Sequence, residues 1–394
     1  MSHEQDAMRD ARCARRDEPT LTRDEKRETR NGRLPTLSLM RSYRLGDPDL
    51  DARIRALAED AVAGTGHGHE DVDLISEMMV TALRLHRDRA DRGDIKLVNT
   101  ALKEMRYAFL VFSQYQHIPK VTVFGSARTQ PGDTNYQLAS AFAEYMVESL
   151  RWMVVTGAGP GTMEAANRGA GGAYSFGVNI RLPFEAEANP YVDGARLINF
   201  KYFFTRKLVF VKESDAFALF PGGFGTQDET YELLTLTQTG KTSLHPIVLM
   251  EAPGTGYWDK WIDFVKGTLV EQGMITLDDL SLFKHATDVD TAAGEIARFY
   301  SNYHSQRYVD DRLVLRFRHA LSPADIERLN DEFGDILADG RIEAIDATPD
   351  EIEDHDVTDL PRIRLHFDRR SLGRLRQMVD VVNGLGPGSW GLNP

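Results

Sequence analysis

The segment LFPGGFGTQDE combines glycines with two carboxylates at a spacing that could serve phosphate chemistry. Glycine lets backbone N–H groups approach an anion closely, and a helix that begins there adds the positive end of its dipole. Asp228 and Glu229 would then stand in the first turn of that helix, next to the sugar of a bound sugar phosphate. The segment therefore predicts a phosphate cradle beside an acidic group, formed by Pro221, Gly222, Gly223, Gly225 and Thr226.

Thr226 and Glu229 also fit a simpler, structural role. Their T-x-x-E spacing is that of a capping box, in which Thr226 caps the helix and Glu229 reaches back to the N–H group of the cap. Asp228 and Glu229 differ by about 100° around a helix, so both cannot easily face one atom. If the segment is catalytic, we expect one acting carboxylate, Glu229 rather than Asp228, and a contact to the ligand from Asp228.

Two further glycine-rich loops, FGSAR and TGAGPGT, each follow a short apolar run. A single loop of this kind is equally well explained by tight packing. Three of them at strand ends of one sheet predict a phosphorylated ligand, because open parallel sheets bind ligands at the carboxyl ends of their strands. The candidate phosphate-binding residues of these two loops are Gly125, Ser126, Arg128, Gly157, Gly159, Gly161 and Thr162.

Neither of the common nucleotide fingerprints fits these loops. The second loop reads G-x-G-x-G-T, so Thr162 stands where the dinucleotide fingerprint has its third glycine, although Glu185 or Glu187 could mimic the ribose-binding acid. A Walker A loop needs an earlier glycine before Gly-Lys-Ser/Thr, and the Gly-Lys-Thr at 240–242 lacks it.

Arg206 and Lys207 stand together in FFTRKLVF, at the expected start of another helix. One explanation is a charged pair on the surface. The other is that Arg206 enters the pocket and pairs with the phosphate or with the carboxylate, with Lys207 as a second cation beside the ligand.

The elements that must position these residues lie in the centre of the chain, over 119–305. Apolar runs alternate there with amphipathic stretches, as in a parallel sheet that is buried on both faces. We therefore expect an α/β fold, a Rossmann-like doubly wound parallel sheet with helices on both faces. The expected strands are KVTVFGSA, RWMVVTGAGPG, SFGVNIRLP, LINFKYFF, DAFALFPGG and HPIVLM, and AAGEIARFYSNYH is expected to be helical.

Three segments flank this centre. Residues 1–48 are rich in charge and read as a disordered or loose arm, whereas 49–118 shows helical periodicity and predicts a helical extension. Over residues 306–394 the order of expected strands and helices changes to β-α-β-β-α. This order predicts a small, separate α+β domain, with Ser322 as a helix cap.

One strand of this C-terminal domain carries an alternating charged pattern. Arg362, Arg364 and His366 are typical of the solvated face of a half-buried strand, and a ligand site on that face is the alternative.

Composition limits the choice of partners. A net charge of −13 argues against a broad nucleic-acid surface, and the single cysteine, Cys13, excludes disulfides and Cys-rich zinc sites and fits a reducing cytosol. The chain has no apolar run that could span a membrane and no signal-peptide core at its N-terminus. We expect a cytoplasmic protein that binds neither nucleic acid nor membranes.

The spacing of the His and Asp residues predicts no metal site, and His67 and His69 are expected to be loop residues.

Taken together, these residues resemble the Lonely Guy (LOG) family, long misnamed lysine decarboxylases. The family signature P-G-G-x-G-T-x-x-E is met over 221–229, the family's Arg-Lys pair is similar to 206–207, and TGAGPGTMEAANRGA completes the likeness, which covers roughly 119–300. The long flanks resemble those of the longer bacterial members. The resemblance implies a homodimer or higher homo-oligomer and the hydrolysis of a nucleoside 5′-monophosphate to free base and ribose 5-phosphate, without a cofactor.

The resemblance also assigns roles. Glu229 would stabilise the oxocarbenium-like sugar, hold its hydroxyls or activate water, and Arg206 would support it. The backbone of 157–162 and 222–226 would bind the 5′-phosphate. A lysine decarboxylase would need a pyridoxal phosphate Schiff-base lysine, for which the sequence offers only Lys207, beside the arginine already in use.

The sequence is compatible with several functions. The substrate could be an AMP-like nucleotide such as a cytokinin ribotide, or any of a broad set of purine and pyrimidine nucleotides in salvage. A non-catalytic carrier of a nucleotide or of molybdenum cofactor would use the same glycine loops, but it would have no need of both Arg206 and Glu229. The C-terminal domain could be a sensor.

Overall fold

The structure is a computed structural model that describes residues 43–63, 71–181 and 188–385. The chain divides into two compact units, 1–98 and 99–394. The expected arm lies outside the described residues as far as position 42, as do Cys13, His67, His69, Glu185 and Glu187. Among the described residues, no helix combines the length and apolar character that a membrane span requires.

The first unit is helical, as the sequence predicts. It contains α2 (Pro48–Val62) and α3 (Asp71–Arg87), and α4 (Arg92–Phe112) crosses from the first unit into the second. The start of α2 follows from its sequence, because the side chain of Asp47 accepts a hydrogen bond from the N–H group of Leu50 and proline occupies the first turn.

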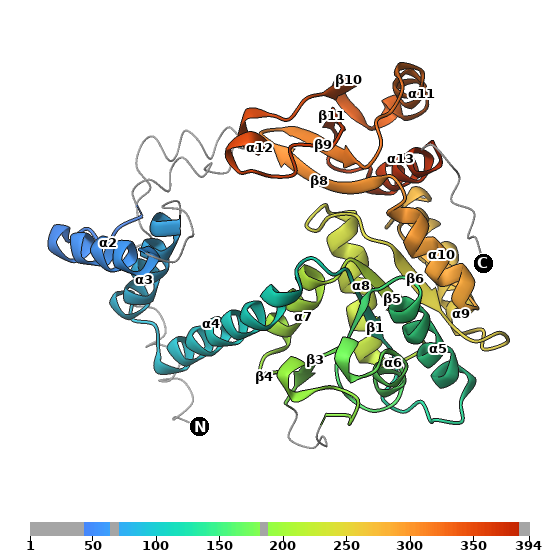
Figure 1. Cartoon of the computed structure of the whole chain (residues 1–394), viewed down its shortest axis with the longest axis horizontal. Helices are drawn as coiled ribbons and strands as arrows, with labels where there is room; N and C mark the ends of the chain where they lie inside the picture. The colour runs from blue at the N-terminus through green and yellow to red at the C-terminus, as the bar shows by residue number, and fades with distance from the viewer. Residues whose placement is uncertain (1–42, 64–70, 182–187, 386–394) are drawn as a thin grey trace, which may run out of the picture. The chain divides into compact units, whose positions relative to one another are not determined.

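The second unit contains a seven-stranded parallel sheet, which confirms the predicted fold class (Figure 1). The strand order is β4-β3-β2-β1-β5-β6-β7. The first strand, β1, therefore lies in the middle of the sheet, and later strands are added outward on both sides. The strands are β1 (Lys120–Phe124), β2 (Met153–Thr156), β3 (Ser175–Ile180), β4 (Leu197–Phe200), β5 (Ala216–Leu219), β6 (Ile247–Met250) and β7 (Lys284–Ala286).

Helices cover both faces of this sheet because its strands are apolar on both sides. Val154 of β2 belongs to a buried cluster with α5 (Thr134–Glu148), α6 (Thr162–Ala170) and α10 (Val289–Phe299). Its neighbours Met153 and Val155 belong to another cluster, on the opposite face. The helices of that second cluster are the C-terminal part of α4, α7 (Phe203–Glu213), α8 (Phe224–Gln238) and α9 (Tyr257–Phe264), which a π-helix (Val265–Val270) extends.

Two predictions about secondary structure in this region are wrong. The edge strand β7 is only three residues long and was not expected. The predicted helix over 292–304 ends at Phe299, and strand β8 begins at Tyr303. Tyr303 is fully buried in the core under the second sheet, so tertiary packing outweighs local helical preference there.

The C-terminal part is α+β, as expected, with one strand and one short helix more than predicted. Its antiparallel sheet has the order β10-β11-β9-β8, and Ser322 caps α11 in a capping box. It shares a buried cluster with Leu244 and Leu282 of the preceding region, so the two sheets have part of their core in common. The elements are β8 (Tyr303–Val309), β9 (Arg312–Phe317), α11 (Pro323–Phe333), β10 (Leu337–Ile345), α12 (Pro349–Glu353), β11 (Arg362–Phe367) and α13 (Leu372–Gly384).

The expectation of a solvated strand face is wrong for Arg362, which is buried. Its Nη1 lies 2.6 Å from Oε1 of Glu351, and Nη2 of Arg316 lies 2.8 Å from the same oxygen. Burial opposes ionisation of Glu351, but hydrogen bonds from Thr348 and from the two guanidinium groups lower its pKa to about 2. A helix too short to recognise in the sequence, α12, therefore supplies the counter-charge for two buried arginines.

Arg364 and His366 border a small cavity of about 440 Å³ on the C-terminal sheet. The polar side chains around it pair with one another: Arg364 Nη2 lies 2.6 Å from Glu343, and His366 Nδ1 lies 2.8 Å from Asp339. A ligand site on this strand face stays a prediction.

Replacing Glu351 with Gln is expected to lower the free energy of unfolding by about 3 kcal/mol or more, because two buried guanidinium groups lose a shared counter-charge. Chemical denaturation followed by circular dichroism measures the change. Glu353→Gln removes an exposed carboxylate from the end of the same helix and should change stability by less than about 0.5 kcal/mol. Equal stability of the two variants would contradict this account of the buried network.

Candidate active site

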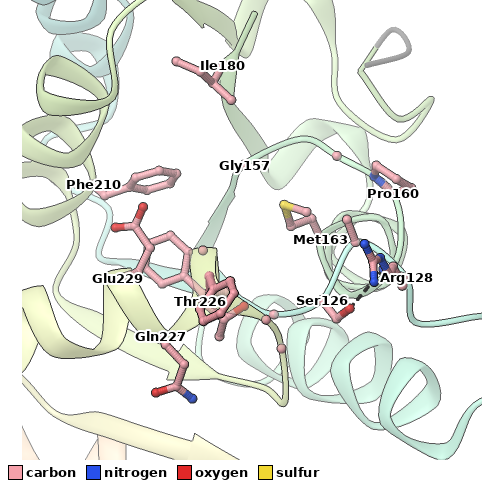
Figure 2. A pocket seen from close by; sticks show the side chains of 18 of the residues that line it. Ser126, Arg128, Gly157, Pro160, Met163, Ile180, Phe210, Thr226, Gln227 and Glu229 are labelled. Carbon is pink, nitrogen blue, oxygen red and sulfur yellow. Dashed lines mark hydrogen bonds between the residues drawn. The ribbon is translucent and has the colours of Figure 1, made fainter. Parts of the chain in front are cut away.

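A cavity of about 800 Å³ lies at the carboxyl ends of β1, β2 and β5, where the three glycine-rich loops meet (Figure 2). Eleven of the residues singled out in the sequence line it. They are Gly125, Ser126, Arg128, Gly157, Gly159, Arg206, Gly222, Gly223, Gly225, Thr226 and Glu229. Residues from four separate stretches of the chain are thus brought to one cavity.

The three loops are joined to one another by backbone hydrogen bonds. The N–H group of Thr162 donates to the carbonyl of Ser126 at 3.0 Å, and the N–H group of Ser126 donates to the carbonyl of Pro221 at 3.2 Å. Glycine makes this approach feasible: Gly161 has φ +73°, and a Cβ atom there would lie 2.3 Å from the carbonyl oxygen of Ser126. Thr162 and Pro221 therefore support the cavity without lining it.

Two helices begin at the cavity, and their positions correct the predicted capping box. Helix α8 starts at Phe224 with Gly223 as its cap, and no side chain among the described residues caps it. Thr226 is consequently inside the first turn rather than at the cap, and Glu229 lines the cavity instead of reaching back. Helix α6 begins at Thr162, so the positive ends of both helix dipoles are directed at the cavity.

The carboxylate of Glu229 is buried at the cavity wall, with 7% of the residue exposed. Its Oε1 lies 3.8 Å from Nη2 of Arg206, and its Oε2 lies 3.6 Å from Nζ of Lys207. Burial raises the pKa of Glu229 to about 7, against the opposing effect of Lys207 and Arg206. Near neutral pH this carboxyl group can therefore exist in either protonation state, as a catalytic acid or base requires.

Arg206 is held in the cavity by two aromatic rings. Its guanidinium carbon lies 4.9 Å from the ring centre of Phe203 and 5.7 Å from that of Phe210, and both phenylalanines line the cavity. These cation–π contacts fix the group beside Glu229. The charge is therefore presented to the ligand space and is not a surface charge.

Lys207 lies behind the cavity wall and contacts three carboxylates of α8. Its Nζ is 2.9 Å from Asp228, 2.8 Å from Glu232 and 3.6 Å from Glu229. The expectation that Asp228 and Glu229 could not face one atom is thus wrong, because the long lysine side chain lies between them. Asp228 is nevertheless exposed and outside the cavity lining, whereas Glu229 is buried and within it.

Nine lining residues were not singled out in the sequence, and most of them are apolar. Phe203 and Phe224 stand inside the quoted motifs FFTRK and PGGFGT, so an aromatic residue beside a charged or glycine-rich motif was the available signal. Ile180 and Phe210 come to the cavity only through the strand order and the helix packing. The nine are Phe124, Ala127, Pro160, Met163, Ile180, Phe203, Phe210, Phe224 and Gln227.

Tyr257, the first residue of α9, supports the third loop from outside. Its hydroxyl donates to the carbonyl of Gly222 at 2.6 Å and accepts from the side chain of Gln227 at 2.5 Å. No motif in the sequence points to this residue, since it follows Gly222 by 35 positions.

Comparison with known proteins agrees with the resemblance seen in the sequence. Residues 160–296 match the family described as "Possible lysine decarboxylase". The domain built on the parallel sheet is therefore similar to this family, and we call it the LOG-like domain. Over 72 residues the chain is 40% identical to the "Probable cytokinin riboside 5'-monophosphate phosphoribohydrolase LOG6" of Arabidopsis thaliana. That match covers 18% of this chain and 33% of the relative, so the chain spans about a third of the length of that relative.

Solved structures resemble part of the chain more distantly. The X-ray structure of TM1055 is 22% identical and covers 46% of this chain and 99% of its own, with a TM-score of 0.35. The molybdenum cofactor carrier protein of Chlamydomonas reinhardtii is 20% identical and covers 46% and 97%, with a TM-score of 0.33. Sequence identities and TM-scores this low do not establish a shared activity.

Gly161→Ala is expected to weaken binding of a phosphate-bearing ligand about tenfold or more, because the added methyl group forces the first two loops apart. Calorimetric titration with ribose 5-phosphate measures the change. Gly132→Ala is the control, since an added Cβ at Gly132 would meet open space among the described residues. Unchanged affinity in Gly161→Ala would show that the loops do not need this close approach.

Proposed function

We propose that the LOG-like domain hydrolyses the N-glycosidic bond of nucleoside 5′-monophosphates, releasing free base and ribose 5-phosphate. The observation that carries this proposal is the buried carboxylate of Glu229 at the wall of a cavity rimmed by three glycine-rich loops. A phosphate cradle and a carboxylate with a pKa of about 7 in one cavity suit a substrate in which a phosphate and a reactive sugar are joined.

The 5′-phosphate would bind at the starts of α6 and α8. The first-turn N–H groups of a helix have no partner within the helix, and together with the helix dipole they bind anions. Arg128 and the hydroxyl group of Ser126 line the same side of the cavity and add a charge and a donor. The predicted contacts of Lys207 and Asp228 with the ligand would be indirect: Lys207 would act through Glu229, and Asp228 through Lys207.

The base and the glycosidic bond would lie at the other side. Figure 2 labels Glu229 and Phe210 on one side of the cavity and Ser126 and Arg128 on the other, with Met163 between them. Aromatic and aliphatic side chains suit the flat, apolar faces of a nucleobase. A ligand anchored by its phosphate at the loops would therefore present its sugar toward Glu229.

Bond cleavage would follow the usual course of glycosidic hydrolysis. The bond between C1′ and the base nitrogen breaks, its electron pair leaves with the base, and positive charge develops on the sugar. Ionised Glu229 would stabilise that charge or accept a proton from the water whose oxygen bonds to C1′. Arg206, fixed by Phe203 and Phe210, would orient the carboxylate. This chemistry calls for no redox cofactor.

The proposed reaction does not by itself specify which nucleobase the substrate carries. AMP-like nucleotides, cytokinin ribotides and a broad set of salvage nucleotides all carry the same ribose 5-phosphate. Support for the cytokinin option comes from the name of the Arabidopsis relative, which matches 18% of this chain. The carrier alternative shares the phosphate cradle but gives no role to a buried carboxylate near neutral pKa.

The homo-oligomer that the resemblance implies stays a prediction. Large apolar side chains are exposed on α7 and at the start of α8, and a contact between copies would cover them. They are Phe203 (48% exposed), Phe204 (53%), Leu208 (49%) and Phe224 (97%).

Purified protein is expected to release free base and ribose 5-phosphate from at least one of AMP, CMP, GMP, IMP and isopentenyladenosine monophosphate. Glu229→Gln should lower kcat/KM about 100-fold or more, because a neutral amide cannot stabilise the sugar cation or accept a proton. Chromatography of the released base measures both, and the ranking of substrates gives the base preference.

Asp228→Asn is the matched control, since it removes a charge beside Lys207 but outside the cavity lining. Its effect should remain below about tenfold. If the folded wild type binds ribose 5-phosphate but releases no base from any of the five nucleotides, the cavity holds a ligand without cleaving it, and the carrier function replaces the hydrolase.

The pH dependence offers a separate test of the role of Glu229. Because its pKa is raised and the ionised form acts, kcat/KM should fall as pH drops below about 7. Lys207→Met removes a cation that lowers this pKa, so the acidic limb should move to higher pH. Lys212→Met, on the same helix but paired with Glu213, is the control. A limb that does not move in Lys207→Met would belong to another group, such as the substrate phosphate.

A further inference from the structure

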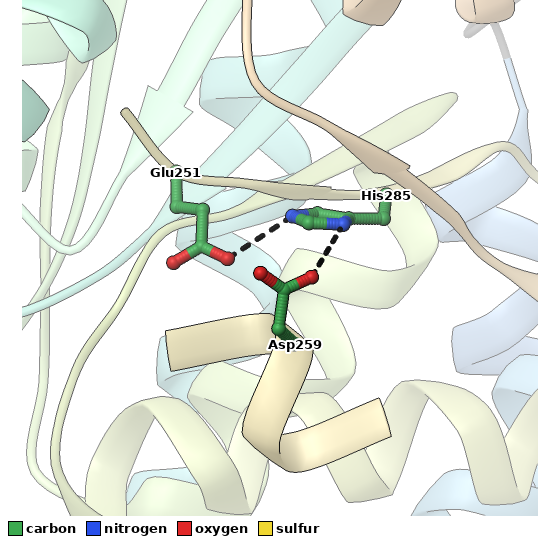
Figure 3. A group of neighbouring side chains, drawn as sticks. All are labelled: Glu251, Asp259 and His285. Carbon is green, nitrogen blue, oxygen red and sulfur yellow. Dashed lines mark ion pairs between the residues drawn. The ribbon is translucent and has the colours of Figure 1, made fainter. Parts of the chain in front are cut away.

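A second group of titratable side chains lies near the far edge of the parallel sheet (Figure 3). Glu251 directly follows β6, His285 stands in the neighbouring edge strand β7, and Asp259 is in the first turn of α9. Nε2 of His285 lies 3.1 Å from Oε1 of Glu251, and Nδ1 lies 3.5 Å from Oδ1 of Asp259. One ligand atom from each residue falls within 4.8 Å of the others.

The charges of this group suit a cation. Glu251 is almost fully buried, with 2% of its side chain exposed. Its two oxygens accept hydrogen bonds from the N–H groups of Tyr257 and Trp258 at 2.7 and 3.1 Å, which orients the carboxylate. Asp259 adds a second carboxylate, near the other ring nitrogen, so with neutral His285 the group would carry two negative charges beside one imidazole.

The donor set points to a class of ion. One imidazole nitrogen and two carboxylate oxygens are typical ligands of Zn²⁺ and related divalent transition-metal ions, whereas Mg²⁺ prefers oxygen alone. The site is also accessible, since the side chain of Asp259 is 69% exposed and that of His285 is 23% exposed. An ion could therefore enter from solvent without unfolding the edge of the sheet.

We propose that Glu251, Asp259 and His285 bind a divalent transition-metal ion of the zinc class. The site is separate from the proposed reaction, because none of the three is among the described residues that line the active-site cavity. It is joined to that cavity through α9: the N–H group of Tyr257 bonds to Glu251, and the Tyr257 hydroxyl bonds to Gly222 of the third loop. A bound ion would brace the helix that supports this loop.

The same geometry would also suit a protonated imidazole held between two carboxylates without a metal. Binding of Zn²⁺ distinguishes a metal site from such an ion-paired histidine. Isothermal titration of the full-length protein, stripped with a chelator and free of nucleotide, is expected to show one equivalent of Zn²⁺ bound in the micromolar range or tighter, with much weaker binding of Mg²⁺. Because this readout needs no catalysis, its failure and that of the proposed hydrolase are distinguishable.

Asp259→Asn is the first variant, since its exposed side chain can be changed without loss of core packing. It should weaken Zn²⁺ binding about tenfold or more. His366→Gln is the matched control: His366 also lies between two carboxylates, Asp339 at 2.8 Å and Asp311 at 3.5 Å, and its loss should leave the affinity unchanged.

A second variant, His285→Gln, removes the only nitrogen ligand and should abolish the bound equivalent, with circular dichroism to verify that the protein is folded. Absence of saturable Zn²⁺ binding in the wild type, or equal affinity in the wild type and Asp259→Asn, would overturn the proposal and leave an ion-paired histidine.

Discussion

The candidate site depends on the close backbone approach of three loops that lie far apart in the sequence. The hydrogen bonds from Thr162 to Ser126 and from Ser126 to Pro221 join the ends of β1, β2 and β5 into one rim. Only glycine at 161 can adopt the required φ of +73° without strain and still leave room for the carbonyl of Ser126. Because this rim fixes where α6 and α8 begin, it also fixes where their dipoles point and where Glu229 stands.

Glu229 illustrates a balance between stability and chemistry. Burial of a carboxylate is unfavourable, and Arg206 and Lys207 compensate for it only in part, since the pKa remains raised to about 7. Arg206 stands on the ligand side between aromatic rings, whereas Lys207 stands behind the wall and is shared with Asp228 and Glu232. The two cations thus differ in position: both lower the pKa of Glu229, but Arg206 lines the cavity and Lys207 does not.

Much of this arrangement could be predicted from local sequence, because glycine loops, strand patterns and the P-G-G-x-G-T-x-x-E signature are local features. What could not be predicted depends on which segments the fold brings together. The predicted capping box is wrong because α8 starts two residues before Thr226. The alternating pattern around Arg362 predicted a solvated side chain, but Arg362 is buried because Glu351 of α12 pairs with it. The apolar wall around Ile180 and the group around His285 combine residues that are distant in the chain, and no spacing reveals them.

The central claim is that the loops bind the phosphate of a nucleotide whose sugar then faces Glu229. A crystal structure of Glu229→Gln soaked with AMP tests it most directly. We predict the phosphate at the starts of α6 and α8 and C1′ of the ribose within about 4 Å of the side-chain amide of residue 229, a near-attack distance with allowance for the larger group. A phosphate bound elsewhere, or a ribose turned away from residue 229, would contradict the account.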